Sequence, residues 1–133
     1  ESLLAEGTGE PWRVLPTDTI MGHIHLHVSD LERAAAFYKE GLGFDVVCRY
    51  HQALFLSTGG YHHHIAINTW NGVGAPAPAE NSVGIDSFAL KLPSDNMRKR
   101  AVERLQYLNA DVDEISGSFV AKDPSGNVIQ LLV

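Results

Sequence analysis

Apolar and polar residues alternate between residues 20 and 28. One set is aliphatic and the other carries imidazoles: Ile24, Leu26 and Val28 against His23, His25 and His27. Successive side chains of a strand point to opposite faces. The pattern therefore predicts a strand that packs an aliphatic face on a core and presents histidines on the other face.

A helical period follows this strand. Ser29 and Glu32 have the spacing of a capping box, and the Asp30 carboxylate complements the dipole at a helix start. Apolar residues then recur at helical spacing, at Leu31, Ala34, Ala35, Tyr38 and Leu42. Gly41 and Gly43 end the run, so we expect a helix of about three turns.

Strand-like runs at residues 44–50, 53–56 and 61–68 complete a βαβββ order. The segment 72–78 mixes Gly, Ala and Pro and cannot continue a sheet or helix. A second cycle then begins with a strand at 84–92 and a helix capped by Ser94 or Asp95. Three more short runs end at Val133, with Asp123 and Asn127 as turn formers before the last one.

This order predicts an α+β fold of two βαβββ modules, at about residues 19–70 and 82–133, joined by a Gly/Ala/Pro loop. Residues 1–18, which mix Gly and Pro with a few apolar residues, are expected to be an arm or linker. A hydrophobic fraction of 44% in 133 residues is sufficient for one globular domain.

Composition also limits the partners. The net charge is −6 and no stripe of Lys and Arg is visible, so nucleic acid is not expected as a partner. No apolar run reaches the roughly 18 residues that a membrane span needs, so we expect no membrane association and a cytoplasmic location. Cys48, the single cysteine, lies in an apolar stretch and is expected to be a small buried hydrophobe.

Three segments resemble the vicinal oxygen chelate superfamily, which includes glyoxalases, bleomycin resistance proteins and extradiol dioxygenases. They are GHIHLHVSDLERAAAFYKEGLGF at 22–44, YHHHIAINTW at 61–70 and DPSGN at 123–127. The chain is most similar to the C-terminal half of catechol 2,3-dioxygenase-like proteins. The resemblance implies a cup-shaped, curved mixed sheet with helices on its convex side and metal ligands on its concave side.

On such a sheet, strand alternation places His62, His64, Ala66 and Asn68 on the same side as His23, and His63 on the other side. A single strand histidine is usually a surface or core residue, but several imidazoles on one concave face favour metal contact. The resemblance implies His23, His64 and Gln130 as metal ligands and His62 as a catalytic group. The implied substrate contacts are His25, Asn68 and Ser87.

The implied ligand set is incomplete, because Ser87 stands where relatives carry histidine and Gln130 where they carry glutamate. A hydroxyl and an amide are weaker ligands than imidazole and carboxylate. The implied cofactor is a divalent metal, first Fe(II), with Mn, Zn or Ni as alternatives, or no metal in this chain alone. A homodimer, or an N-terminal module outside this chain, would supply the missing groups.

Three functions remain open from the sequence. The first is a metal-dependent domain of a ring-cleaving dioxygenase that acts on a small aromatic or vicinal-oxygen substrate. The second is a non-catalytic module that binds a small molecule or stabilises a partner half, which Ser87 and Gln130 favour. The third is a glyoxalase-like lyase.

Overall fold

The chain folds into two four-stranded mixed sheets that repeat one strand order. A computed structural model describes residues 11, 13–79 and 81–133. The first half contains β1 (Ile24–His27), α1 (Leu31–Ala35), the π-helical turn η2 (Ala36–Gly41), β2 (Asp45–Tyr50), β3 (Ala53–Ser57) and β4 (Ile65–Asn68). The second half contains β5 (Phe88–Lys91), α2 (Asp95–Tyr107), β6 (Asp111–Ile115), β7 (Ser118–Lys122) and β8 (Val128–Leu132).

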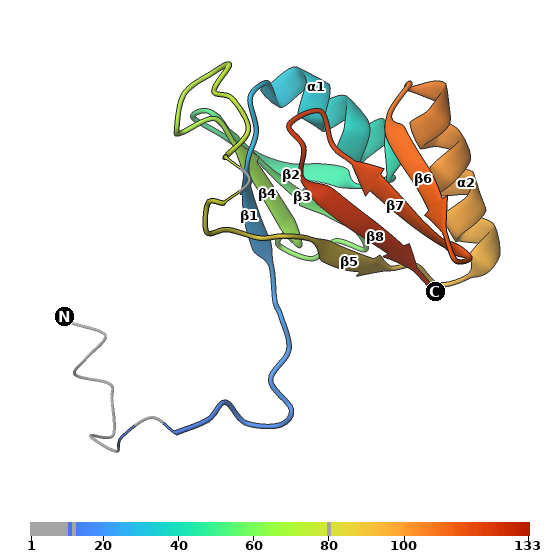
Figure 1. Ribbon diagram of the computed structural model, residues 1–133. Coiled ribbons are helices and arrows are strands. Elements are labelled where there is room, and N and C mark those ends of the chain that lie inside the picture. Colours follow the sequence, from blue (N-terminus) through green and yellow to red (C-terminus); the bar gives the residue numbers. More distant parts are fainter. Residues whose placement is uncertain (1–10, 12, 80) are drawn as a thin grey trace.

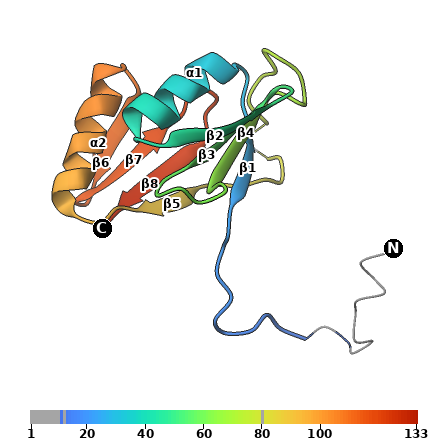
Figure 2. The same ribbon diagram turned by 180° about the vertical axis from the view of Figure 1, so that it is seen from behind.

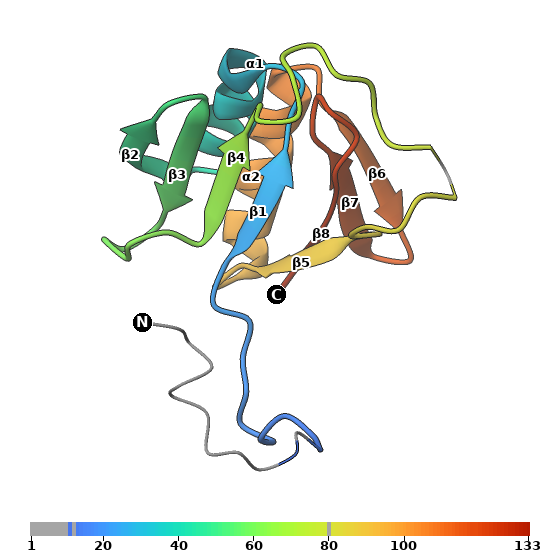
Figure 3. The same ribbon diagram turned by 90° about the vertical axis from the view of Figure 1, so that its left-hand side faces the viewer.

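The sheet orders are β1-β4-β3-β2 and β5-β8-β7-β6, so each half has the same topology. In both sheets the first strand runs parallel to the last, and the remaining pairs are antiparallel. The helices lie on one side of the first sheet, behind β1, β4 and β3 in Figure 3. This arrangement confirms the predicted α+β class and the βαβββ repeat.

A continuous core fills the space between the helices and the strands of both halves. On β1, Leu26 and the following Val28 are buried, and Ile24 packs against the same core. The predicted aliphatic face of β1 is therefore confirmed. Gly41 is needed where η2 meets α2, because a Cβ at this position would lie 2.5 Å from the Leu105 Cδ2 atom.

The first helix begins differently from the prediction. The Asp30 side chain, not that of Ser29, is the N-cap, and its Oδ1 accepts hydrogen bonds from the backbone N–H groups of Glu32 and Arg33. The Ser29 N–H instead donates to Ser125 Oγ at 2.9 Å, in the other half of the chain. Ser125, 96 residues away in the sequence, therefore accepts the hydrogen bond from the Ser29 N–H that Glu32 would accept in a local capping box.

The turn from Asp123 to Asn127 connects the two halves. Asp123 is buried, and its Oδ1 accepts from the N–H groups of Ser125 and Asn127. Its Oδ2 accepts from Asn127 Nδ2 at 2.8 Å and from the Tyr38 hydroxyl at 3.0 Å. Burial, the Asp123 charge and this hydrogen bond raise the pKa of Tyr38 well above its ordinary value, so the phenol keeps its proton and donates.

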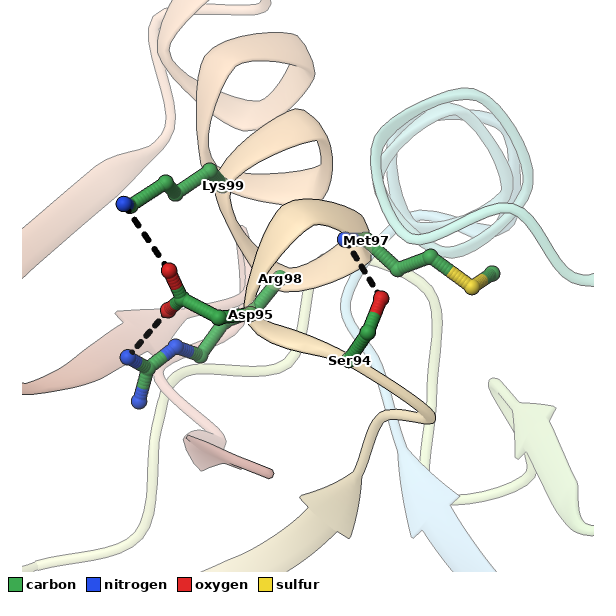
Figure 4. A network of polar contacts seen from close by, with 5 residues as sticks. All are labelled: Ser94, Asp95, Met97, Arg98 and Lys99. Atoms are coloured by element: carbon green, nitrogen blue, oxygen red, sulfur yellow. Dashed lines mark hydrogen bonds and ion pairs between the residues drawn. The ribbon is translucent and has the colours of Figure 1, made fainter.

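The second helix has the expected kind of N-terminus. Of the two predicted caps, Ser94 acts, since its Oγ accepts from the Met97 N–H at 3.3 Å (Figure 4). Asp95 forms ion pairs with Arg98 at 2.7 Å and Lys99 at 2.8 Å. Exposed pairs of this kind stabilise a helix by only a few tenths of a kcal/mol each, so the cap and the apolar face dominate.

Cys48 is exposed, so the prediction that it is buried was wrong. It lies on β2, the outer strand of its sheet, where the pairing with β3 shifts between Val46 and Cys48. Five of the six residues of β2 are exposed, Val47 and Arg49 beside Cys48 among them, so neither face of this outer strand is covered at Cys48. The apolar residues around Cys48 therefore do not indicate burial.

Three strands are clearly shorter than predicted. β1 begins at Ile24 instead of residue 20, and β4 begins at Ile65 instead of residue 61. β5 covers only Phe88–Lys91 of the predicted 84–92. Residues 13–22 extend away from the sheets (Figures 1 and 2).

Of the helices in the described residues, none is sufficiently long and apolar to cross a membrane.

Candidate metal centre

Three histidines come together where β1 and β4 begin. His23 directly precedes β1, and His62 and His63 lie just before β4. These strands are parallel neighbours with Ile24 paired to Ile65, so their starts are adjacent. One ring nitrogen from each histidine lies within 4.8 Å of the others. We call His23, His62 and His63 the three-histidine group.

The ring contacts extend beyond this group. The centroid of His63 lies 4.3 Å from that of His23 and 4.6 Å from that of His62. His25 lies 5.5 Å from both His23 and His63. Phe55 on β3 packs beside them, 5.0 Å from His63. The group therefore has an aromatic surface on one side, on the face of the sheet that points away from the helices.

The prediction that His63 points away from His23 was wrong. It assumed that strand alternation extends through residues 61–64, but this segment is irregular and β4 begins only at Ile65. Outside a regular strand, the backbone does not force neighbouring side chains to opposite faces. His62 and His63 can therefore both turn toward His23.

His64 makes different contacts. Its Nδ1 lies 3.3 Å from Ser57 Oγ and 3.4 Å from the backbone nitrogen of Thr58. Its ring also lies 4.8 Å from that of Tyr61. Among the described residues, His64 is not one of the three whose ligand atoms converge. Its predicted role as a metal ligand remains a prediction.

The environment of His63 favours the neutral form of its imidazole. Partial burial lowers its pKa, and the nearby rings of His23, His62, His25 and His64 lower it further, in that order. Its Nε2 is buried and has no hydrogen-bond partner within the described part of the chain. A neutral imidazole with an unused nitrogen is the form that binds a metal ion.

The predicted residues of the second half form a separate pair. Gln130 on β8 donates from Nε2 to Ser87 Oγ at 3.2 Å. Asn68 closes the turn after β4, because its Oδ1 accepts from the Trp70 N–H at 3.2 Å. These contacts do not test the predicted roles. Metal binding by Gln130 therefore remains a proposal, and so does substrate binding by Ser87, Asn68 and His25.

A hollow of about 940 Å³ lies between the two halves, beside β1. Its walls include His25 and His27, the loop 75–79, residues 82–86 before β5 and the turn 125–128. Its size is within the range of sites for small molecules. Sequence reasoning missed it, because its walls come from segments far apart in the chain.

The fold and the histidine site together define the class of this protein. A profile of the Glyoxalase/Bleomycin resistance protein/Dioxygenase superfamily matches residues 20–131, and the chain belongs to that family. It is 45% identical, over 136 residues, to Catechol-2,3-dioxygenase of Bacillus subtilis (strain 168). This match covers 100% of the chain and 48% of the relative, so the chain spans about half the length of this curated protein. The predicted resemblance to half of a catechol dioxygenase is thereby confirmed.

Solved structures agree on the fold. A glyoxalase/bleomycin resistance protein/dioxygenase domain from Frankia sp. EAN1pec superposes with a TM-score of 0.65 at 18% identity, covering 86% of this chain and 97% of that one. The fosfomycin resistance protein FosX from Mesorhizobium loti gives 0.64 at 20% identity, with 88% and 92% covered. Lactoylglutathione lyase from Agrobacterium tumefaciens gives 0.59 at 23% identity, with 88% and 94% covered. At these identities the likeness concerns the fold alone.

Proposed function

We propose that this chain is a metal-binding domain of a ring-cleaving, catechol-type dioxygenase. The observation that carries the proposal is the convergence of His23, His62 and His63 within 4.8 Å. The 45% identity to half of a catechol 2,3-dioxygenase supports the reaction class. The substrate would be a small aromatic compound with neighbouring oxygen atoms.

The donor set of the three-histidine group fits a divalent metal. Imidazole nitrogens suit Fe, Zn, Cu and Ni, and metal–nitrogen bonds of about 2.0–2.1 Å bring ligand atoms within about 4 Å of one another. Modest side-chain rotations would therefore close the group around an ion. A bound Fe(II) with open coordination positions would supply the chemistry that joins a catecholate and dioxygen.

The remaining groups have proposed roles around this ion. The His25 and Phe55 rings, 6.0 Å apart, offer an aromatic wall for a planar substrate. The family resemblance also implies a proton-transfer role for His62 and metal ligation by His64 and Gln130. The hydrogen bonds around His64 favour a different role for that residue. A carboxylate is absent from the three-histidine group, so we propose that a module outside this chain supplies the missing acidic ligand.

Metal binding is the first test. Titration of the metal-free chain with Fe(II) under anaerobic conditions, or with Zn(II), is expected to give one site per chain. His23→Ala should weaken it at least about tenfold, as expected for loss of an important group at a metal site. His51→Ala is the matched control, because His51 lies in the β2–β3 turn outside the group. Equal affinities for both variants would refute the site.

Ring cleavage is the second test. The full-length protein loaded with Fe(II) should convert catechol to a yellow ring-opened product, and His23→Ala should abolish this activity. If the metal binds without ring cleavage, the metal site stands and the dioxygenase assignment fails.

The alternative is a non-catalytic module, favoured by the Ser87–Gln130 hydrogen bond, in which each neutral group satisfies the other. A metal that binds the folded chain must raise its melting temperature by mass action. An unchanged melting temperature with Fe(II), Zn(II) or Mn(II) would therefore favour this alternative.

A further inference from the structure

We propose that His64 is fixed as the tautomer that carries its proton on Nε2. It is then a hydrogen-bond donor at the edge of the site and leaves metal binding to His23, His62 and His63. The part of this inference that concerns the metal rests on the proposed function. The part that concerns the tautomer stands on the hydrogen bonds around His64 alone.

The evidence is the set of groups around the Nδ1 atom of His64. The backbone N–H of Thr58 points at it, with 3.4 Å between the nitrogens. Ser57 Oγ lies 3.3 Å from the same atom and 3.1 Å from the Thr58 carbonyl oxygen. A backbone N–H can only donate, whereas a hydroxyl can donate or accept.

Two proton arrangements have to be compared. If Nδ1 is unprotonated, the Thr58 N–H donates to it, and the Ser57 hydroxyl donates to Nδ1 or to the Thr58 carbonyl. Every donor then has an acceptor. If Nδ1 carries the proton, it donates to Ser57 Oγ, but its hydrogen and that of the Thr58 N–H then face each other across 3.4 Å. The first arrangement is favoured.

The tautomer decides what His64 can bind. A neutral imidazole has one protonated and one unprotonated nitrogen. With the Nδ1 lone pair engaged by Thr58, the proton is on Nε2, which then has no lone pair for a metal. A metal could bind His64 Nε2 only if the proton moved to Nδ1. The Thr58 N–H, which points at Nδ1, disfavours a proton there. In contrast, the Nε2 of His63 has no partner among the described residues.

His64 is nevertheless close to the metal centre. The Tyr61 ring connects them, 4.8 Å from His64 and 4.2 Å from His62. An N–H group in this place is suited to an oxygen atom of a ligand bound at the metal. His64 is therefore inferred to select ligands that present a hydrogen-bond acceptor, and not to hold the ion.

Nitrogen NMR of the full chain tests the inference. Long-range proton–nitrogen spectra, recorded above the ordinary histidine pKa of about 6.5, distinguish the two tautomers. His64 should show a protonated Nε2 and an acceptor Nδ1 in the metal-free protein. Addition of Zn(II), a diamagnetic probe, should shift nitrogens of His23, His62 and His63 and leave His64 in the same tautomer. An Nδ1–H tautomer, or a His64 nitrogen that joins the shift, would overturn the inference.

A pair of variants gives an independent readout. In His64→Asn the amide oxygen can still accept from Thr58, whereas the Nε2–H is lost. Its Zn(II) affinity should stay within about twofold of the wild type, and that of His63→Asn should fall at least about tenfold. Equal losses in both variants would contradict the assignment. If Zn(II) shifts no histidine in the wild type, the metal site fails, and the tautomer of the metal-free protein still decides the assignment of His64.

Discussion

Five imidazoles share one patch, and four of them disfavour protonation of the fifth, His63. His63 lies at its centre and feels the other four: His23, His25, His62 and His64. Partial desolvation and these neighbours disfavour a charged ring at His63. At the scale of single residues, the patch therefore keeps His63 neutral, and the stability of the fold is expected to be sensitive to acid.

The acid response of stability follows from the lowered pKa of His63. The unfolded chain binds this proton at about pH 6.5, and the folded chain only at lower pH. The stability that neutral His63 contributes is therefore fully present above about pH 6.5. It decreases as the pH falls from there through the pKa that His63 has in the folded chain. Urea unfolding at a series of pH values should show a smaller acid loss in His63→Asn than in the wild type.

His51→Asn is the control for this experiment, because it also removes one histidine but outside the patch. It should retain the acid dependence of the wild type. The same dependence in the wild type and in His63→Asn would show that the neighbours of His63 do not disfavour its protonation.

At the scale of elements, the turn before β8 does more than reverse the chain. The Asp123 carboxylate organises the turn and accepts from Tyr38 of η2 at 3.0 Å. Asn127 Nδ2 also donates to the backbone carbonyl of His27 at the end of β1, at 3.3 Å. The turn thus holds β1 and η2 of the first half against the second half.

Tyr38→Phe is predicted to destabilise the protein by about 1–3 kcal/mol, because a buried carboxylate oxygen loses a donor. The change removes only a hydroxyl from a fully buried ring, so packing is retained. Urea unfolding measures the difference. Tyr107→Phe, on the exposed face of α2, is the matched control and should have almost no effect. Equal effects would mean that the Tyr38 hydroxyl contributes nothing.

At the scale of the whole molecule, the segment before β1 leaves apolar side chains in solvent. Val14, Leu15, Ile20 and Met21 are between 62% and 86% exposed. The curated relative is about twice as long as this chain. Exposed apolar groups of this kind are typical of surfaces that contact another domain or another copy.

Self-association of the isolated chain is therefore predicted. Light scattering at micromolar concentration should give about twice the chain mass of 14.5 kDa. Replacing Ile20 and Met21 by Ser should shift the protein toward the monomer, whereas Val73→Ser, an exposed residue of the connecting loop, should not. A monomer in the wild type would contradict the prediction and indicate that the two halves satisfy each other.

The repeat and the faces of the regular elements could be predicted from the sequence. Ile24, Leu26 and Val28 alternate with the histidines of β1, and this alternation alone placed the aliphatic side on the core. The helix period, the Ser94 cap and the turn at Asp123 are equally local, because each depends on residues within a few positions. The resemblance of three segments then identified the family.

Only the tertiary structure decided which imidazoles meet. His62, His63 and His64 follow one another in an irregular segment, where no periodicity relates side-chain direction to position. Groups outside this segment lie against their rings. His62 and His63 meet His23, and His64 contacts Ser57 and Thr58. Tertiary structure likewise decides that Ser29 binds Ser125 and that Cys48 is exposed on an outer strand. Local patterns determine faces within regular elements and the form of tight turns, whereas contacts between residues that are not neighbours in the sequence determine where side chains point in irregular segments.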